Sequence, residues 1–172
     1  MHKIYLILVT FVVFTSCASA QEKSPDTIVY REVNDVALKA YIFKPARPGK
    51  NRPAILFFHG GGWRIGEPAW TFYRAKEFAD HGMVAICIQY RLANGGLTPA
   101  DGVEDACAAF AWARTHAVEW GIDPKRVAGY GLSAGGHLVT SASVANCSRQ
   151  SDWTRVSSKC HATVFAGAKY ER

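Results

Sequence analysis

The chain lacks an apolar run long enough to cross a bilayer. It has 172 residues, and its longest apolar stretch, Ile4–Phe14, falls short of the roughly 20 residues that a membrane helix needs. It also has no internal repeat and no low-complexity segment. Hydrophobic residues make up 49% of the chain and charged residues 20%, which is typical of a globular protein and not of a disordered one. The length suits one domain with a hydrophobic core.

The features of metal and nucleic-acid sites are absent as well. There is no CxxC pair and no Cys/His cluster, so we expect neither a metal ion nor a cofactor. The formal net charge is +6, but the lysines and arginines are scattered and no aromatic residues are interleaved with them. This distribution argues against a nucleic-acid-binding surface.

The N-terminus has the three regions of a secretory signal peptide. His2 and Lys3 form a short basic start, Ile4–Phe14 is apolar apart from one threonine, and Ala18–Ala20 is a small-residue cleavage site. We predict that residues 1–20 are removed and that the protein is secreted or periplasmic. Cleavage lowers the formal net charge from +6 to +5, because it removes one lysine.

The cysteines allow several interpretations. Lipoprotein processing at Cys17 is a second choice for the N-terminus, since a phenylalanine three residues earlier suits that reaction poorly. Export permits disulfides, and Cys147 and Cys160 flank a polar loop that a disulfide would close. Cys87 in a predicted strand and Cys107 on a predicted helix face are expected to be small buried hydrophobic residues.

The mature chain, residues 21–172, is predicted to be one α/β domain. A hairpin is expected first, and apolar runs then alternate with helical patterns, with a turn at Asp123-Pro124. Such alternation implies a mostly parallel sheet with helices on both faces and the antiparallel hairpin at one edge. The predicted strands are Thr27–Val33, Val36–Lys44, Ala54–Phe58, Met83–Gln89, Val127–Leu132 and Ala162–Ala166, and the predicted helices are Ala69–Asp80, Thr98–Trp120 and Ala134–Ala145.

A Gly-x-Ser-x-Gly pattern, Gly131 to Gly135, lies between a predicted strand and a predicted helix. This is the context of a nucleophile elbow, a turn so sharp that the serine projects from the sheet and its neighbours two residues away have no room for a Cβ atom. Attack of Ser133 on an ester creates an oxyanion, which needs fixed N–H donors. Ala134 supplies one donor, and the glycines of HGGGW, residues 59–63, leave a second loop bare enough to supply others.

These motifs resemble the α/β-hydrolase superfamily. The likeness is to its hormone-sensitive-lipase-like esterases and to secreted polysaccharide acetyl- or feruloyl-type esterases. The resemblance covers roughly residues 28–168, and the matching segments, in order, are FFHGGGW (57–63), YRLA (90–93) and GIDPKRVAGYGLSAGGHL (121–138).

The resemblance implies a role for most of the site residues. Ser133 would be the nucleophile, and the N–H groups of Gly61, Gly62 and Ala134 would form the oxyanion hole. His59 would order the loop without acting as the general base. Trp63 and Tyr90 are expected to line the substrate site, and His137, four residues after the nucleophile, is expected to be a neighbour that packs there or contacts substrate.

A complete catalytic triad is not apparent. Such enzymes place an acid and then a histidine after the nucleophile, and the family places both after two further strands, which we expect beyond residue 172. Asp152 and His161 have the right order, but His161 precedes a predicted strand and should lie at the opposite edge of the sheet, about 16 Å away. We therefore expect an incomplete hydrolase domain without its C-terminal strands, nearly inactive by itself.

The predicted function is a serine carboxylic-ester hydrolase that acts on small or sugar-linked acyl esters. The short region before Thr27 leaves little room for a cap, which favours an open site. One alternative is a non-catalytic relic or binding module of the same fold. A more remote one is a dinucleotide-binding oxidoreductase, because Gly129 to Ala134 also fits a G-x-G-x-x-A fingerprint, although no acidic residue ends the following predicted strand.

Overall fold

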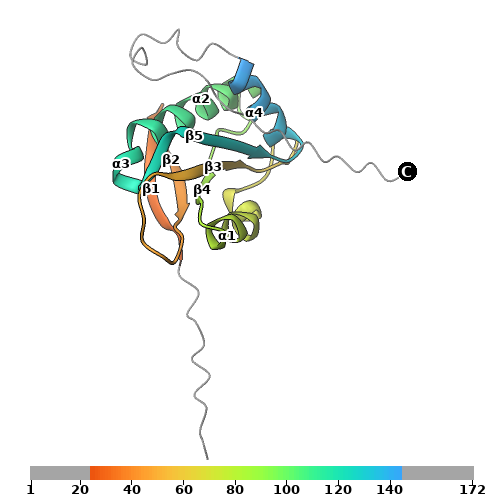
Figure 1. The fold of residues 1–172 in the computed structure, drawn as a ribbon. Coiled ribbons are helices and arrows are strands. Elements are labelled where there is room, and N and C mark those ends of the chain that lie inside the picture. The colour runs from red at the N-terminus through yellow and green to blue at the C-terminus, as the bar shows by residue number, and fades with distance from the viewer. Residues whose placement is uncertain (1–23, 145–172) are drawn as a thin grey trace, which may run out of the picture.

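The fold is a five-stranded mixed sheet with helices on both sides. The computed structural model describes residues 24–144, and its sheet order is β1-β2-β4-β3-β5 (Figure 1). The strands are β1 (Asp26–Val33), β2 (Val36–Phe43), β3 (Arg52–Phe58), β4 (Val84–Ile88) and β5 (Ile122–Gly131). The helices are the short 3-10 helix η1 (Pro68–Thr71), α1 (Phe72–Asp80), α2 (Pro99–Thr115), α3 (Ala117–Trp120) and α4 (Ala134–Val144).

The strand directions confirm the predicted hairpin and crossovers. β1 and β2 pair antiparallel around a turn at Asn34 and Asp35, both of which have positive φ. β2 also runs antiparallel to β4, whereas β3 pairs parallel with β4 on one side and with β5 on the other. The carboxyl ends of β3, β4 and β5 therefore lie at one edge, where ligands bind in open α/β sheets.

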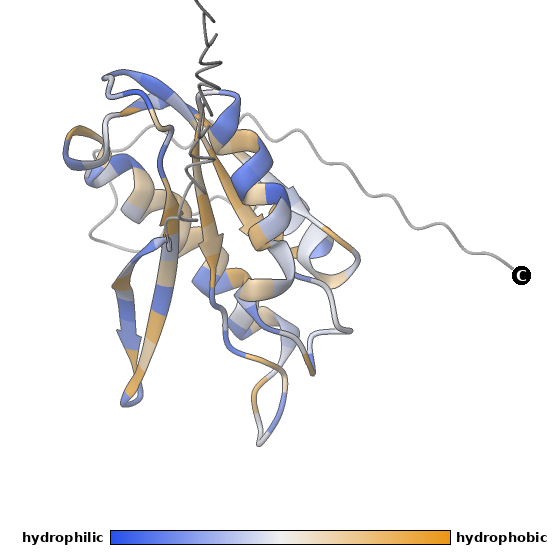
Figure 2. Cartoon of the chain, turned by 90° about the horizontal axis from the view of Figure 1, so that it is seen from below, coloured by the Kyte–Doolittle hydropathy of each residue, from blue (hydrophilic) through white to orange (hydrophobic). Residues whose placement is uncertain are grey.

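Helices cover the two faces of this sheet unequally. α1 lies on one side and α2 and α4 lie on the other, as Figure 1 shows. The apolar side chains of β3 and β4 alternate between the two faces, so Phe57 and Cys87 pack toward α1 while Phe58 and Ile86 join the larger core under α2 and α4. Figure 2 shows the most hydrophobic colouring on the central strands, while hydrophilic and hydrophobic residues are mixed along the helices. This burial is the main source of stability.

Helix α2 begins with a capping box and ends earlier than the sequence predicts. Thr98 and Asp101 form a reciprocal capping box, with the Thr98 N–H donating to Asp101 Oδ2 over 2.8 Å, and Pro99 fills the first helical position. The predicted helix continues to Trp120, but the structure breaks it at His116 into α2 and the single turn α3. Gly121 then caps α3 with a left-handed φ of 68°.

Three further details differ from the predicted elements. β5 starts at Ile122, so the expected turn at Asp123-Pro124 lies inside the strand. The helix expected from Ala69 starts as η1 and becomes α-helical only at Phe72. The predicted strand Ala162–Ala166 lies outside the described residues. Within residues 24–144, no helix is long and apolar enough to cross a membrane.

Candidate active site

Ser133 occupies a strained turn between β5 and α4. Its φ is +52°, a left-handed conformation that is uncommon for a residue with a side chain, and its side chain is exposed at the carboxyl edge of the sheet. α4 starts at the next residue, Ala134, so the positive end of the helix points at the serine. This is the geometry that the Gly-x-Ser-x-Gly pattern predicts.

The two glycines of the elbow are required by close backbone contact. A Cβ atom at Gly131 would lie 2.2 Å from the carbonyl oxygen of Gly135, and one at Gly135 would lie 2.1 Å from the carbonyl oxygen of Phe58. Any side chain at either position would force backbone to move. The first turn of α4 is therefore pressed against the end of β3, and this fixes the direction in which Ser133 projects.

The HGGGW loop follows β3 and lies directly against the elbow. A Cβ atom at Gly60 would be 3.0 Å from the carbonyl oxygen of Leu132 and 3.6 Å from Cβ of Ser133. β3 and β5 are neighbours in the sheet, and their pairing extends to Phe58 opposite Gly131. The two glycine tracts, about seventy residues apart in sequence, thus meet at one point in space.

The loop folds back on itself just beyond this contact. Gly61 and Gly62 have φ values of +117° and +58°, and Trp63 has +63°. The carbonyl oxygen of Gly61 accepts hydrogen bonds from the N–H groups of Arg64 and Ile65, both at 3.1 Å. Gly61 is close-packed, because a Cβ there would lie 2.0 Å from the carbonyl oxygen of Ile65, while the space around Gly62 is open.

Several N–H groups near Ser133 remain available. Among the described residues, the amides of Gly61 and Gly62 donate to no acceptor. Ala134 is the first residue of α4, so its N–H has no partner within the helix. Three unused donors on two adjoining segments can hold an oxyanion. The roles of Ser133, Gly61, Gly62 and Ala134 stay predictions.

His59 is a buried support of the loop. It is 2% exposed, its Nδ1 lies 2.7 Å from the carbonyl oxygen of Gly60, and Gly66 packs against the same ring. Burial lowers the pKa of His59 from its usual value, so the neutral ring donates its Nδ1 proton to that carbonyl. His59 therefore stabilises the turn and has no access to the Ser133 hydroxyl as a base.

Tyr90 lies under the loop and not on the surface of the site. It is 3% exposed, its ring stacks on His59 with 4.3 Å between centroids, and its hydroxyl donates to the carbonyl oxygen of His59 over 2.8 Å. Sequence reasoning placed Tyr90 among the substrate contacts. Its burial instead favours a role in holding the loop in place, although it also lines a pocket of about 310 Å³ behind the loop.

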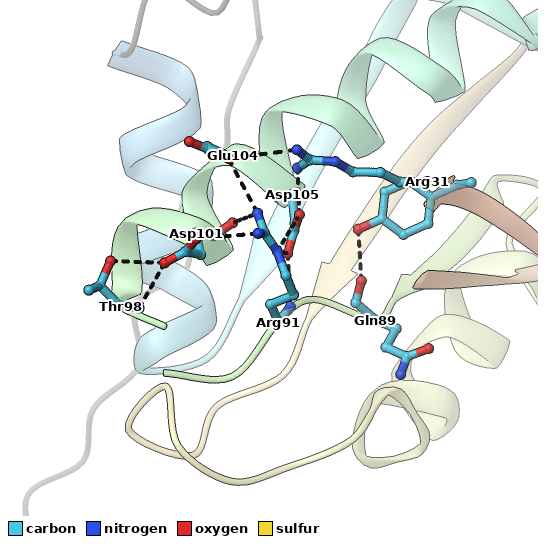
Figure 3. Close-up of polar contacts among 8 residues, drawn as sticks. Arg31, Gln89, Arg91, Thr98, Asp101, Glu104 and Asp105 are labelled. Atoms are coloured by element: carbon cyan, nitrogen blue, oxygen red, sulfur yellow. Dashed lines mark hydrogen bonds and ion pairs between the residues drawn. The ribbon is translucent and has the colours of Figure 1, made fainter. Parts of the chain in front are cut away.

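The segment that carries Tyr90 is fixed by a buried ion-pair network (Figure 3). Asp105, on α2, is wholly buried and accepts hydrogen bonds from the backbone N–H and the Nε of Arg91, both at 2.9 Å. Arg31 on β1 binds the other oxygen of the same carboxylate, and Arg91 also reaches Glu104 at 3.3 Å. Two arginines thus compensate one buried charge.

The sequence motifs do not predict this network. No motif singles out Asp105, and the structure shows it fully buried and hydrogen-bonded. The signal that could have found it is the arginine of YRLA, which follows a buried strand and needs an acidic partner. Its effect is to join β1, the segment after β4 and α2 beneath the site.

Trp63 and His137 meet beside the nucleophile. Their rings pack edge to face with 5.2 Å between centroids, and the carbonyl oxygen of Trp63 accepts a 2.7 Å hydrogen bond from the N–H of Ala93. His137 is exposed on α4, and its Nε2 lies 3.4 Å from the hydroxyl of Ser141. Their contact with substrate remains a prediction.

A general base for Ser133 is not found in the described range. Within residues 24–144, no histidine and no carboxylate forms a hydrogen bond with the Ser133 hydroxyl. The side chain of His137 is directed to Trp63 and Ser141 instead. Asp152 and His161 lie outside the described residues. Likewise, no group of three or more potential metal ligands occurs in the described part of the chain.

The cysteine interpretation needs one correction. Cys107 forms a disulfide, so it is not the simple buried hydrophobic residue that the sequence suggested. Cys87 is free and buried as predicted, and burial raises the pKa of its thiol to about 12. A thiol in this state is not a nucleophile. The suggested pair Cys147 and Cys160 lies outside the described residues.

The fold and the elbow together define the class of α/β-hydrolase esterases. The model of the BD-FAE family matches residues 41–166, and the chain belongs to this family. The described part of the fold is accordingly a partial α/β-hydrolase fold with the predicted sheet and helix arrangement. The family match includes both the HGGGW loop and the elbow.

Similar proteins of known activity are esterases. The chain is 34% identical over 114 residues to carboxylesterase NlhH of Mycobacterium tuberculosis, covering 65% of this chain and 34% of that protein. It is 32% identical over 114 residues to an arylesterase of Saccharolobus solfataricus, covering 66% of this chain and 37% of that protein. The chain thus spans about a third of the length of these relatives.

Similar solved structures are also esterases. A propionate-bound esterase of the planctomycete Thermogutta terrifontis superposes with a TM-score of 0.76 at 40% identity, covering 83% of this chain and 54% of that one. Esterase 2 of the same organism, phosphorylated by paraoxon, gives a TM-score of 0.76 at 38% identity and covers 85% of this chain and 58% of that one. The similarity therefore extends over most of this chain.

Proposed function

We propose that the protein is a serine carboxylic-ester hydrolase with Ser133 as its nucleophile. The observation that carries the proposal is the convergence of two loops. Gly60 lies within 3.6 Å of the Ser133 side chain, as measured from a Cβ built on the glycine, and the amides of Gly61, Gly62 and Ala134 have no acceptor near it. The esterase relatives and the solved esterase structures support the same chemistry. They also favour it over dinucleotide binding.

The proposed reaction runs through an acyl-enzyme. Ser133 Oγ attacks the carbonyl carbon of the ester, its proton passes to an imidazole, and the amides of Gly61, Gly62 and Ala134 stabilise the oxyanion. The tetrahedral intermediate collapses, and the imidazole gives the proton to the departing alcohol. In the second half of the reaction, the imidazole takes a proton from a water molecule, which attacks the acyl carbonyl carbon. The imidazole then returns this proton to Ser133 Oγ as the acid is released. The imidazole and the acid that orients it belong to a part of the protein outside residues 24–144.

The substrate proposal is a small or sugar-linked acyl ester. Ser133 and Leu132 are exposed, and the loop and the elbow form an open edge in the described residues. An open site accepts an acyl group that projects from a larger molecule. Together with the secretory signal peptide predicted at residues 1–20, this favours an extracellular or periplasmic ester such as an acetylated or feruloylated sugar.

The test is ester hydrolysis by the protein as expressed from its natural gene. We expect turnover of 4-nitrophenyl acetate, and Ser133→Ala should lower kcat by a factor of about 10⁴ or more, as for other serine hydrolases that lose the nucleophile. Ser143→Ala, ten residues further along the chain, is the control and should leave kcat unchanged. Equal activity of wild type and Ser133→Ala would refute the proposal, and failure to hydrolyse acetylated or feruloylated sugars would refute only the substrate class.

A further inference from the structure

A second pocket lies at the opposite edge of the sheet from Ser133. It has a volume of about 290 Å³ and is lined by the segment after β2, the first residues of β3 and β4, and α3. Arg52, Val84 and Gly121 mark the amino ends of β3, β4 and β5, whereas the elbow and the HGGGW loop follow carboxyl ends. The pocket is therefore separate from the proposed catalytic site, and its volume is near the lower end for small-molecule sites.

Hydrogen bonds and close packing fix the walls of the pocket. The N–H of Arg52 donates to the carbonyl oxygen of Gly121 over 2.9 Å. The Arg52 guanidinium donates to the carbonyl oxygens of Gly82 at 2.9 Å and Arg47 at 2.6 Å. Gly121 packs against Gly49, because a Cβ at Gly121 would lie 2.8 Å from the Gly49 carbonyl oxygen. These bonds hold the 44–52 segment against α3.

Positive charge dominates the lining. Four basic residues come from one short segment, and the single acidic residue in the lining is Glu119. Lys44 is paired with Asp26 at 2.8 Å, but Arg47 and Lys50 have no ion pair among the described residues, and Arg52 binds only carbonyl oxygens there. The four residues are Lys44, Arg47, Lys50 and Arg52. Such an excess attracts an anion.

One wall of the pocket is Trp120. Lys44 Nζ lies 4.5 Å from the centroid of its ring. The ring is partly buried and packs against the larger core, so it forms a fixed wall. Val84 and Val118 add an apolar surface beside the ring.

We propose that this pocket binds a carboxylated sugar residue, that is, a uronic acid. Guanidinium and ammonium groups bind carboxylates by charge-assisted hydrogen bonds, here from Arg47 and Lys50. The apolar surface of Trp120 and the valines suits the C–H faces of a pyranose ring. An inorganic anion would use the charges but not the apolar wall.

The experiment is a titration of the ¹⁵N-labelled protein, expressed from its natural gene, followed by its indole N–H signals. Sodium galacturonate, galactose and sodium phosphate are added in separate arms at equal ionic strength, and Trp120→Phe identifies the Trp120 signal. We expect a saturable shift of that signal with galacturonate, none with galactose, and at least about tenfold weaker binding of phosphate. This readout needs no catalysis, so it is independent of the proposed hydrolase activity.

Matched variants locate the binding. The double variant Arg47→Ala/Lys50→Ala removes two exposed side chains and should weaken galacturonate binding about tenfold or more. Lys39→Ala, an exposed lysine on β2 outside the pocket, should change it less than twofold, and the dispersion of the amide spectrum confirms that each variant is folded. No saturable shift, or equal affinity in the double variant, would overturn the site. Equal affinity for phosphate or galactose would overturn its assignment to a uronic acid.

Discussion

The hydroxyl of Tyr90 donates a 2.8 Å hydrogen bond to the carbonyl oxygen of His59, and the two rings stack 4.3 Å apart. This contact joins the segment after β4 to the loop after β3 at the edge where Ser133 projects. The glycines of that loop have no side chains of their own to hold them. Their position therefore depends on His59, and the position of His59 depends on Tyr90.

Tyr90→Phe is expected to lower kcat more than it changes KM. The variant keeps the ring stacking but leaves the His59 carbonyl oxygen without its donor, so the oxyanion amides lose part of their fixed geometry. We expect kcat to fall roughly three- to thirtyfold and the free energy of unfolding to fall by about 1 kcal/mol. Steady-state kinetics and denaturant unfolding measure both. Tyr73→Phe, an exposed tyrosine on α1, is the control, and unchanged kcat in Tyr90→Phe would contradict the positioning role.

Gly135→Ala is expected to prevent normal folding of the elbow. Its new methyl group would lie 2.1 Å from a backbone oxygen of Phe58, which cannot move without disturbing β3. We expect a loss of at least about 3 kcal/mol in the free energy of unfolding. Gly136→Ala is the matched control, because the nearest atom there is 3.2 Å away and alanine favours the helix by up to about 1 kcal/mol. If thermal unfolding gives the two variants the same stability, the close contact at Gly135 is contradicted.

Stability should depend on pH through His59. Burial lowers the pKa of this side chain in the folded state, so below about pH 6.5 the unfolded chain binds a proton that the folded chain does not. The contribution of His59 is therefore complete above that pH and is lost as the pH falls toward the lower folded pKa. His59→Gln, which cannot titrate, should show a shallower decline in unfolding free energy between pH 6.5 and pH 5. An identical decline in wild type and variant would contradict the neutral buried ring.

Asp105→Asn is expected to be strongly destabilising. The substitution removes the charge that compensates Arg91 and Arg31 and leaves the buried Arg91 guanidinium short of an acceptor. We expect a loss of about 3 kcal/mol or more in the free energy of unfolding, measured by urea denaturation. The control is Glu104→Gln on the same helix, whose half-exposed carboxylate should contribute less than about 1 kcal/mol. A small effect of Asp105→Asn would show that the network is not a structural anchor.

The order of the strands and helices and the position of the elbow could be predicted from the sequence. Long apolar strands, a helix start at Thr98 and glycines on both sides of Ser133 are local signals, and each is confirmed in the structure. The elbow is predictable because its requirement is steric and acts over a few residues. The family match to residues 41–166 includes these segments.

The supports of the site could not be predicted in the same way. Tyr90 contacts His59 and Arg91 contacts Asp105 only after the sheet has brought β3, β4 and α2 together, and no local pattern encodes those distances. The break at His116 is similar, since it separates two helical segments whose propensities alone favour one continuous helix. The cationic pocket could not be predicted from the sequence either, because the segment after β2 has the composition of an ordinary turn.

The most direct test of the central claim is the crystal structure of the protein, expressed from its natural gene, after reaction with an organophosphonate ester. The account predicts a phosphonyl group bonded to Ser133 Oγ, with its phosphoryl oxygen about 2.7 to 3.1 Å from the N–H groups of Gly61, Gly62 and Ala134. An adduct on another residue would contradict the account. So would a phosphoryl oxygen on Ser133 that is directed away from these three amides.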